Sequence, residues 1–135
     1  DLFKSYNDFY GHLAGDQCLF NIAKLLEKNL NTELDIIARY GGEEFIIVLP
    51  MKDQNSCLNI ANDLLRSVIE AGFPHSQNPH QIVTLSMGVA SCLPTPEMNI
   101  QHLIKDADNA LYQAKNNGRC QVEVAKKESL SLNYE

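Results

Sequence analysis

The sequence predicts an α+β domain in which helices flank a central, largely antiparallel sheet. Three stretches repeat apolar residues every three or four positions, as amphipathic helices do, and four shorter apolar runs are typical of strands. The two kinds of pattern are mixed along the chain, and two adjacent glycines join two strand patterns in a tight turn. Such a hairpin beside segregated helices is characteristic of the α+β class.

The first predicted helix begins at Gly15 and Asp16 and ends before a loop at residues 29–32. Asp16 suits the N-cap position, because its carboxylate can accept hydrogen bonds from the free N–H groups of the first turn. The inward-facing apolar positions of this helix are Leu19, Ile22, Ala23, Leu26 and Leu30.

A β-hairpin is predicted next, with strands at residues 35–39 and 44–49. Gly41 and Gly42 lie between them, and adjacent glycines favour the positive φ angles of tight hairpin turns. The rest of the chain supplies the remaining helices and strands. These are a helix at 56–71, a strand at 81–90, a helix at 100–115 closed by Asn116-Asn117-Gly118, and a strand at 120–124.

This order lacks only a strand before the first helix to match a ferredoxin-like core. Residues 1–3 are therefore predicted to be the tail of a truncated first strand. Residues 126–135 are polar and are predicted to be an exit segment, which leaves one domain over residues 1–125.

Composition narrows the function classes. The chain has 135 residues, 44% of them hydrophobic, and a net charge of −6. An acidic domain of this kind is not expected to bind nucleic acid, which requires a basic face. No apolar run reaches the ~18 residues that a membrane span needs, so no membrane contact by this domain is expected. The four widely spaced cysteines fit no metal-ligand pattern and indicate reduced thiols in a cytoplasmic protein.

The hairpin turn carries the clearest chemistry. Gly41 and Gly42 would let a ligand approach the backbone closely, because no Cβ stands in the way. Glu43 and Glu44 follow directly. Carboxylate oxygens of this kind suit Mg²⁺, which protein sites usually share with substrate phosphates. Taken alone, a turn of this composition is more often a solvated loop.

The stretch from Arg39 to Phe45, RYGGEEF, resembles the signature of the GGDEF family of diguanylate cyclases, in its GGEEF form. Further motifs match along almost the whole chain. They are DLFK, ND, GH and GD within residues 1–16, TLSMG at 84–88, and AD, ALY, AK and GR within residues 107–119. The resemblance implies a GGDEF domain over residues 1–125, with a nucleotidyl-cyclase-like fold that lacks its N-terminal strand.

The resemblance implies a function in bacterial second-messenger signalling. A diguanylate cyclase joins two GTP molecules into cyclic di-GMP and releases two pyrophosphates, using two Mg²⁺ or Mn²⁺ ions per site. Each domain binds one GTP, so a second copy must face it, and a homodimer is expected. The resemblance also implies an upstream sensory or receiver domain. The location is expected to be cytoplasmic, and the parent protein could be membrane-anchored.

Substrate-binding roles follow from the resemblance, position by position. Asn7 and Asp16 would hydrogen-bond the guanine base, whose carbonyl, ring N–H and amino group complement an amide and a carboxylate. His12 would lie near the nucleotide, although a structural histidine at a turn is equally compatible. The phosphates would meet Lys4, Lys115 and Arg119, with Gly41 and Gly42 beneath them.

Metal-binding roles follow in the same way. Glu43 would be a metal ligand and the candidate for assisting deprotonation of the ribose 3′-hydroxyl. Glu44 would be a second carboxylate at the metal, and the division of roles between the two stays open. The family pattern places a further metal-binding aspartate just before residue 1, because Asp1 matches its second aspartate. Arg39 would support the hairpin or meet the partner subunit's nucleotide.

Two further points concern regulation and alternatives. A product-inhibition motif, RxxD, often precedes the hairpin in the family, but Thr32 stands here where arginine is expected, ahead of Asp35. Threonine cannot form the bidentate phosphate contacts of arginine, so no product-inhibition site is expected. The alternative function is a catalytically silent GGDEF-like module that senses GTP or cyclic di-GMP or supports dimerisation. A third reading, a cyclase accepting ATP, is disfavoured by Asp16 at the base-recognition position.

Overall fold

The computed structural model describes residues 1–126 and confirms the predicted α+β class. The predicted exit segment therefore lies outside the described residues, apart from Lys126. In chain order the elements are α1 (Phe3–Tyr10), α2 (His12–Lys28), β1 (Ile36–Gly41), β2 (Glu44–Val48), α3 (Gln54–Ala71), β3 (Met87–Val89), α4 (Ile100–Asn116) and β4 (Val122–Val124).

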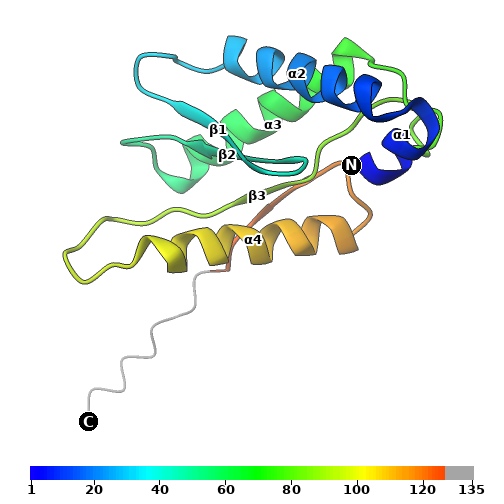
Figure 1. Ribbon diagram of the computed structural model, residues 1–135. Coiled ribbons are helices and arrows are strands. Elements are labelled where there is room, and N and C mark those ends of the chain that lie inside the picture. The colour runs from blue at the N-terminus through cyan, green and yellow to red at the C-terminus, as the bar shows by residue number, and fades with distance from the viewer. Residues whose placement is uncertain (127–135) are drawn as a thin grey trace.

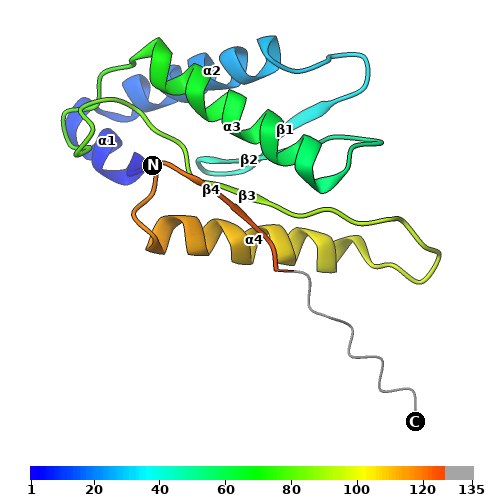
Figure 2. The same cartoon turned by 180° about the vertical axis from the view of Figure 1, so that it is seen from behind.

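The helices lie on both sides of the strands. Figures 1 and 2 show α2 and α3 on one side of the strands and α4 on the other, with α1 at the start of α2. The core lies mainly between α2 and α3, where Ile22, Leu26, Leu64 and Val68 are at most 3% exposed. Side chains of the hairpin, Phe45 among them, pack against this core. No helix among the described residues has the length and apolarity needed to span a bilayer.

The N-terminal segment differs from the prediction. Residues 1–3 are not the tail of a strand, because Leu2 has a left-handed backbone (φ 55°) and Phe3 begins helix α1. Asp1 lies beside the extended segment that precedes β3, and its backbone nitrogen donates to the Thr84 carbonyl oxygen at 2.7 Å. Aromatic packing holds α1 in place, since the Tyr6 ring meets His75 edge-on at 5.1 Å.

The start of α2 also differs. The helix begins at His12 rather than at residues 15–16, and its N-cap is Gly11, which makes no side-chain cap. Asp16 therefore lies in the second turn, and the predicted N-cap role for it is wrong. The reason is α1, whose last turn runs into Gly11 (φ 90°) and sets where α2 begins.

The hairpin forms as predicted. β1 and β2 are antiparallel, with Arg39 opposite Phe45 and Gly41 opposite Glu44. Gly42 takes the left-handed conformation (φ 53°) that the turn requires. Arg39 Nε donates to the Gly42 carbonyl oxygen at 2.7 Å, so Arg39 does support the hairpin.

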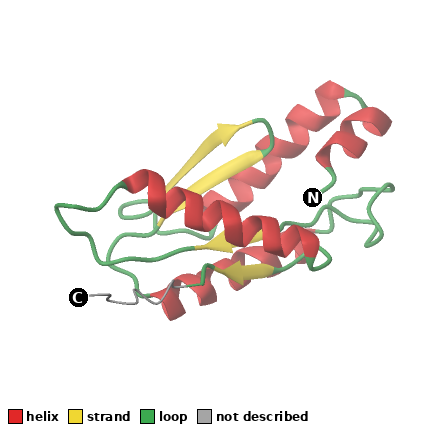
Figure 3. Ribbon diagram, turned by 90° about the horizontal axis from the view of Figure 1, so that it is seen from below, coloured by secondary structure: helices red, strands yellow, loops and turns green. Residues whose placement is uncertain are grey.

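The strands of the described residues form two separate two-stranded sheets, visible as two pairs of arrows in Figure 3. One is the antiparallel hairpin. In the other, β3 pairs with β4 in parallel, as the crossover through α4 requires. Only Met87–Val89 of the predicted strand at 81–90 is a strand, because the preceding residues find little partner backbone beyond the Pro74–Ile82 bridge and the bond from Asp1.

Candidate functional site

The hairpin turn is open to ligands. Apart from the adjacent residues, no atom of residues 1–126 lies within 4 Å of the Cβ that either Gly41 or Gly42 would carry. Glu43 and Glu44 are exposed, and within residues 1–126 neither carboxylate forms an ion pair. The turn thus presents bare backbone and two free carboxylates on the surface.

Charges from distant parts of the chain meet at the N-terminal segment. The Lys115 ammonium, the Arg119 guanidinium and the Glu43 carboxylate all lie within electrostatic reach of the backbone nitrogen of Asp1. Figures 1 and 2 agree, since the hairpin turn and the C-terminal end of α4 both approach the N-terminus.

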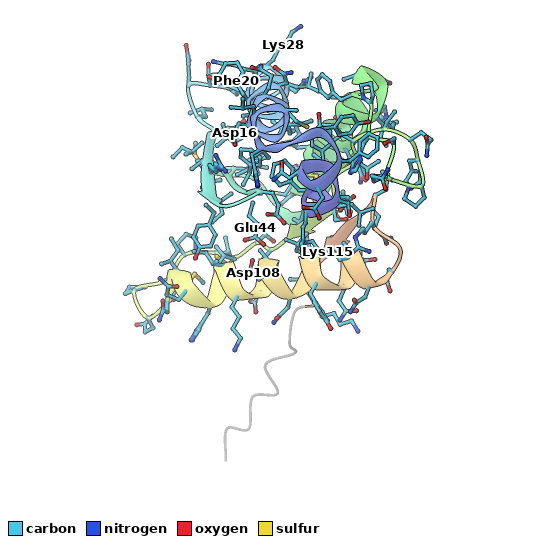
Figure 4. The ribbon with its side chains drawn as sticks, turned by 45° about the vertical axis from the view of Figure 1, so that its right-hand side comes forward. Asp16, Phe20, Lys28, Glu44, Asp108 and Lys115 are labelled. Carbon is cyan, nitrogen blue, oxygen red and sulfur yellow. The ribbon has the colours of Figure 1, made fainter. Side chains whose placement is uncertain are left out.

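Figure 4 shows the same meeting from another side. Glu44 lies between Asp16 on α2 and the helix α4 that carries Asp108 and Lys115. The sequence motifs identified these residues as candidates, but the residues come near one another only in the folded chain.

Close packing of α1 on α2 places Asn7 against the residue that precedes Asp16. The Asn7 amide lies directly against Gly15, where a Cβ would overlap Asn7 Oδ1. Asn7 Oδ1 is buried and has no hydrogen-bond partner within the described part of the chain. A buried acceptor without a partner is rare in folded proteins, and water, an ion or a ligand commonly supplies the missing donor. Asp16 is the next residue along α2 and is exposed.

Lys4 and His12 are both exposed, Lys4 near the start of α1 and His12 directly after the turn that joins α1 to α2. Lys4 lies three residues before Asn7 on α1, so the two side chains share a face of that helix. His12 is the first residue of α2. Neither of them forms an ion pair within residues 1–126.

A groove that sequence reasoning missed runs between α2 and the hairpin. Its volume is about 420 Å³. Asp16 lines it, together with Arg39 from β1 and the rings of Phe20 and Phe45. Phe20 is 57% exposed, and an aromatic residue on the polar face of the predicted helix was the signal available in the sequence.

The turn that carries Arg119 has an unusual backbone. Gly118, Arg119 and Cys120 have φ values of 112°, 63° and 50°. The last two are not glycine, and a left-handed conformation costs such residues about 1–3 kcal/mol each. Arg119 N–H donates to the Ala114 carbonyl oxygen at 2.9 Å, which fixes the turn to the end of α4.

The donor set suits a hard cation but is incomplete in the described residues. No group of three His, Cys, Asp or Glu side chains within residues 1–126 is placed to hold a metal ion. Glu43 and Glu44 supply two carboxylates, and Mg²⁺ usually takes one or two of these plus substrate phosphates. The chemistry of these residues therefore fits a metal that is shared with a phosphorylated substrate.

The predicted remnant of a product-inhibition motif has a local role. Asp35 Oδ2 accepts a hydrogen bond from the Asn31 N–H at 2.9 Å and so closes the turn before β1. Thr32 is exposed within that turn. This carboxylate is therefore partly engaged by its own loop.

Comparison with known proteins gives a consistent result. The family model described as "Diguanylate cyclase, GGDEF domain" matches residues 1–121. Diguanylate cyclase A of Treponema denticola is 38% identical over 126 residues, which cover 93% of this chain and 33% of that protein. The chain thus spans about a third of the length of this relative.

Two solved structures share the fold. The GGDEF domain of DgcB from Caulobacter crescentus, in complex with c-di-GMP, superposes with a TM-score of 0.80 at 30% identity, covering 93% of this chain and 72% of that one. The active GGEEF domain of a diguanylate cyclase from Vibrio cholerae gives a TM-score of 0.80 at 32% identity, covering 94% of this chain and 78% of that one.

Proposed function

This chain belongs to the diguanylate cyclase GGDEF domain family, and from that premise we propose that it condenses two GTP molecules into cyclic di-GMP and two pyrophosphates. The observation that carries the proposal is the open Gly41-Gly42 turn with the exposed Glu43 and Glu44 carboxylates, which approaches the N-terminal segment as the C-terminal end of α4 does. Carboxylates that lie near the cations at the end of α4 suit a metal–triphosphate substrate. The likeness to a GGEEF domain described as active supports the same reading.

Substrate binding divides between the two ends of the site. Asn7 and Asp16 bind the guanine base, and the partnerless Asn7 Oδ1 supports this role because guanine offers N–H donors. The phosphates are bound by Lys4, Lys115 and Arg119 and pass over Gly41 and Gly42 beside His12. The open space above both glycines supports the passage.

Glu43 and Glu44 would hold the Mg²⁺ or Mn²⁺ ions of the site. When bound, these ions polarise the α-phosphate, lower the pKa of the attacking hydroxyl and neutralise the departing pyrophosphate. Glu43, or Glu44 beside it, accepts the proton of the ribose 3′-hydroxyl. Lys115 and Arg119 hold the triphosphate in line for attack.

Two copies of the domain act as a pair. Each ribose 3′-oxygen forms a bond to the α-phosphorus of the opposite GTP, the bond from that phosphorus to the pyrophosphate oxygen breaks, and pyrophosphate leaves. Two such steps close the ring of cyclic di-GMP. The exposed position of Glu43 and Glu44 supports a face-to-face pairing. An upstream sensory or receiver domain would set how often it occurs.

The test uses the natural full-length protein with GTP and Mg²⁺, and measures cyclic di-GMP by chromatography and mass spectrometry. We expect product from this protein and a loss of roughly 100-fold or more in Glu43→Gln, because the amide can neither take the proton nor hold the metal as a carboxylate does. Glu70→Gln, an exposed change on α3, is the matched control and should leave the rate unchanged. A folded dimer that binds GTP without forming product would instead indicate a silent sensing module.

A further inference from the structure

The Asp1 carboxylate is fully engaged by the protein. Ser86 Oγ donates to Asp1 Oδ1 at 2.6 Å, and Thr84 Oγ1 donates to Oδ2 at 2.8 Å. The Cys120 backbone N–H also donates to Oδ2, at 3.2 Å. Thr84 is 1% exposed and in turn accepts from Asn78 Nδ2 at 3.1 Å. With both oxygens occupied by protein donors, Asp1 is poorly placed to bind a metal or a phosphate itself.

One of these donors belongs to the left-handed turn. Cys120 directly follows Arg119, and both have positive φ angles. Such backbone persists only where its surroundings hold it. Two hydrogen bonds restrain this turn. The Asp1 carboxylate accepts from the Cys120 N–H, and Gln121 Nε2 donates to the Arg119 carbonyl oxygen at 3.1 Å.

We propose that Asp1 is a positioning residue, which holds the turn at Cys120 so that the Arg119 guanidinium faces the phosphates of the substrate. The inference rests on the proposed function, since it takes Arg119 to bind phosphate. It assigns Asp1 no contact with substrate. It also links two ends of the chain, because the residue that precedes α1 fixes the residue that follows α4.

The test compares two ligands in the full-length protein by isothermal titration: guanosine, and the α,β-methylene analogue of GTP, which cannot release pyrophosphate. In Asp1→Asn, one of the two acceptor oxygens becomes an NH₂ group, so either Ser86 or the pair Thr84 and Cys120 loses its acceptor. We expect affinity for the GTP analogue to fall roughly five- to tenfold, while affinity for guanosine stays unchanged. In an Arg119→Ala background, Asp1→Asn should produce no further loss.

The controls separate positioning from general destabilisation. Asp106→Asn, an exposed change on α4, should leave both affinities unchanged. Ser86→Ala removes one donor from the carboxylate and is the milder second variant if Asp1→Asn does not fold. It should shift the affinity for the GTP analogue in the same direction.

Two results would overturn the inference alone. One is equal loss of guanosine and GTP-analogue affinity, and the other is a loss in the Arg119→Ala background as large as in the parent. Weakening by Arg119→Ala without any effect of Asp1→Asn or Ser86→Ala would have the same meaning. A parent protein that binds neither ligand would overturn the proposed function together with this inference.

Discussion

Gly15 shapes the end of the proposed site that would recognise the base, because it has no side chain. A Cβ there would overlap Asn7 Oδ1 and come within 3.2 Å of the Phe3 ring. Both of these groups belong to α1, so this glycine lets α1 lie against α2. The glycine therefore sets the position of an amide that we propose reads guanine.

We expect Gly15→Ala to weaken binding of the GTP analogue roughly tenfold and to lower the free energy of unfolding by about 1–3 kcal/mol, because the added methyl group displaces Asn7. Titration calorimetry and urea unfolding measure the two effects. Adding Asn7→Ala removes the overlapping amide, so the double variant should regain most of the lost stability. If Gly15→Ala alone were more stable than the parent, as alanine in an open helix position is, the close contact would be absent.

Elements with a local signal could be predicted from the sequence, and elements that depend on distant partners could not. The hairpin is encoded by its two glycines and flanking apolar runs. Helix α3 begins at Gln54, two residues before the predicted start, and the carboxylate of its N-cap Asp53 accepts from the Ser56 N–H at 2.7 Å. Helix α1 was missed because its aromatic residues are stabilised by contacts such as Tyr6 with His75.

The predicted strand at 81–90 shows the same limit. Its apolar pattern is continuous, but only Met87–Val89 has a strand partner in the described residues. The apolar pattern indicates which residues prefer an extended backbone, whereas strand pairing depends on which other strand lies alongside. The turn strain at Arg119 and Cys120 likewise has no sequence signal, since neither residue favours positive φ.

Helix α4 and strand β3 meet at Gly88, which fixes the helix that carries Lys115. A Cβ at Gly88 would overlap the Ala107 carbonyl oxygen and the Leu111 backbone nitrogen. Backbone atoms cannot move aside as a flexible side chain can. The separation of β3 and α4 is therefore set by this glycine.

We expect Gly88→Ala to destabilise the domain by about 1–3 kcal/mol or more, because α4 must shift as a unit. Urea unfolding gives the change. Gly41→Ala is the matched control for stability only, since Gly41 has open space around it and does not have a positive φ angle. Equal stability of the two variants would show that α4 does not pack on Gly88 as described.

At the scale of the molecule, the proposed site is assembled from three separate segments. These are the α1–α2 corner with Asn7 and Asp16, the hairpin with Glu43 and Glu44, and the C-terminal end of α4 with Lys115. Motifs in the sequence could identify these residues as candidates, because each motif is short and local. That the hairpin turn and the end of α4 both approach the N-terminus depends on the packing of α4 against the strands, which no local pattern encodes.

The proposed pairing of two domains predicts a rate that depends on concentration. We expect the amount of cyclic di-GMP formed per unit of protein to rise with protein concentration and then level off, because a lone domain holds only one of the two GTP molecules. Initial rates over a dilution series, beside sedimentation measurements, test this. A specific activity that stays constant while the protein is monomeric would contradict the paired mechanism.

The open hairpin turn has a consequence for control. Within residues 1–126 nothing but the adjacent residues lies within 4 Å of a Cβ placed on either glycine, so the described part of the domain leaves this turn open to a neighbouring copy. A domain built this way could stay chemically competent at all times and still be silent in the cell. The rate of product formation would then depend on segments outside the domain, which bring the hairpin turns of two copies together or hold them apart.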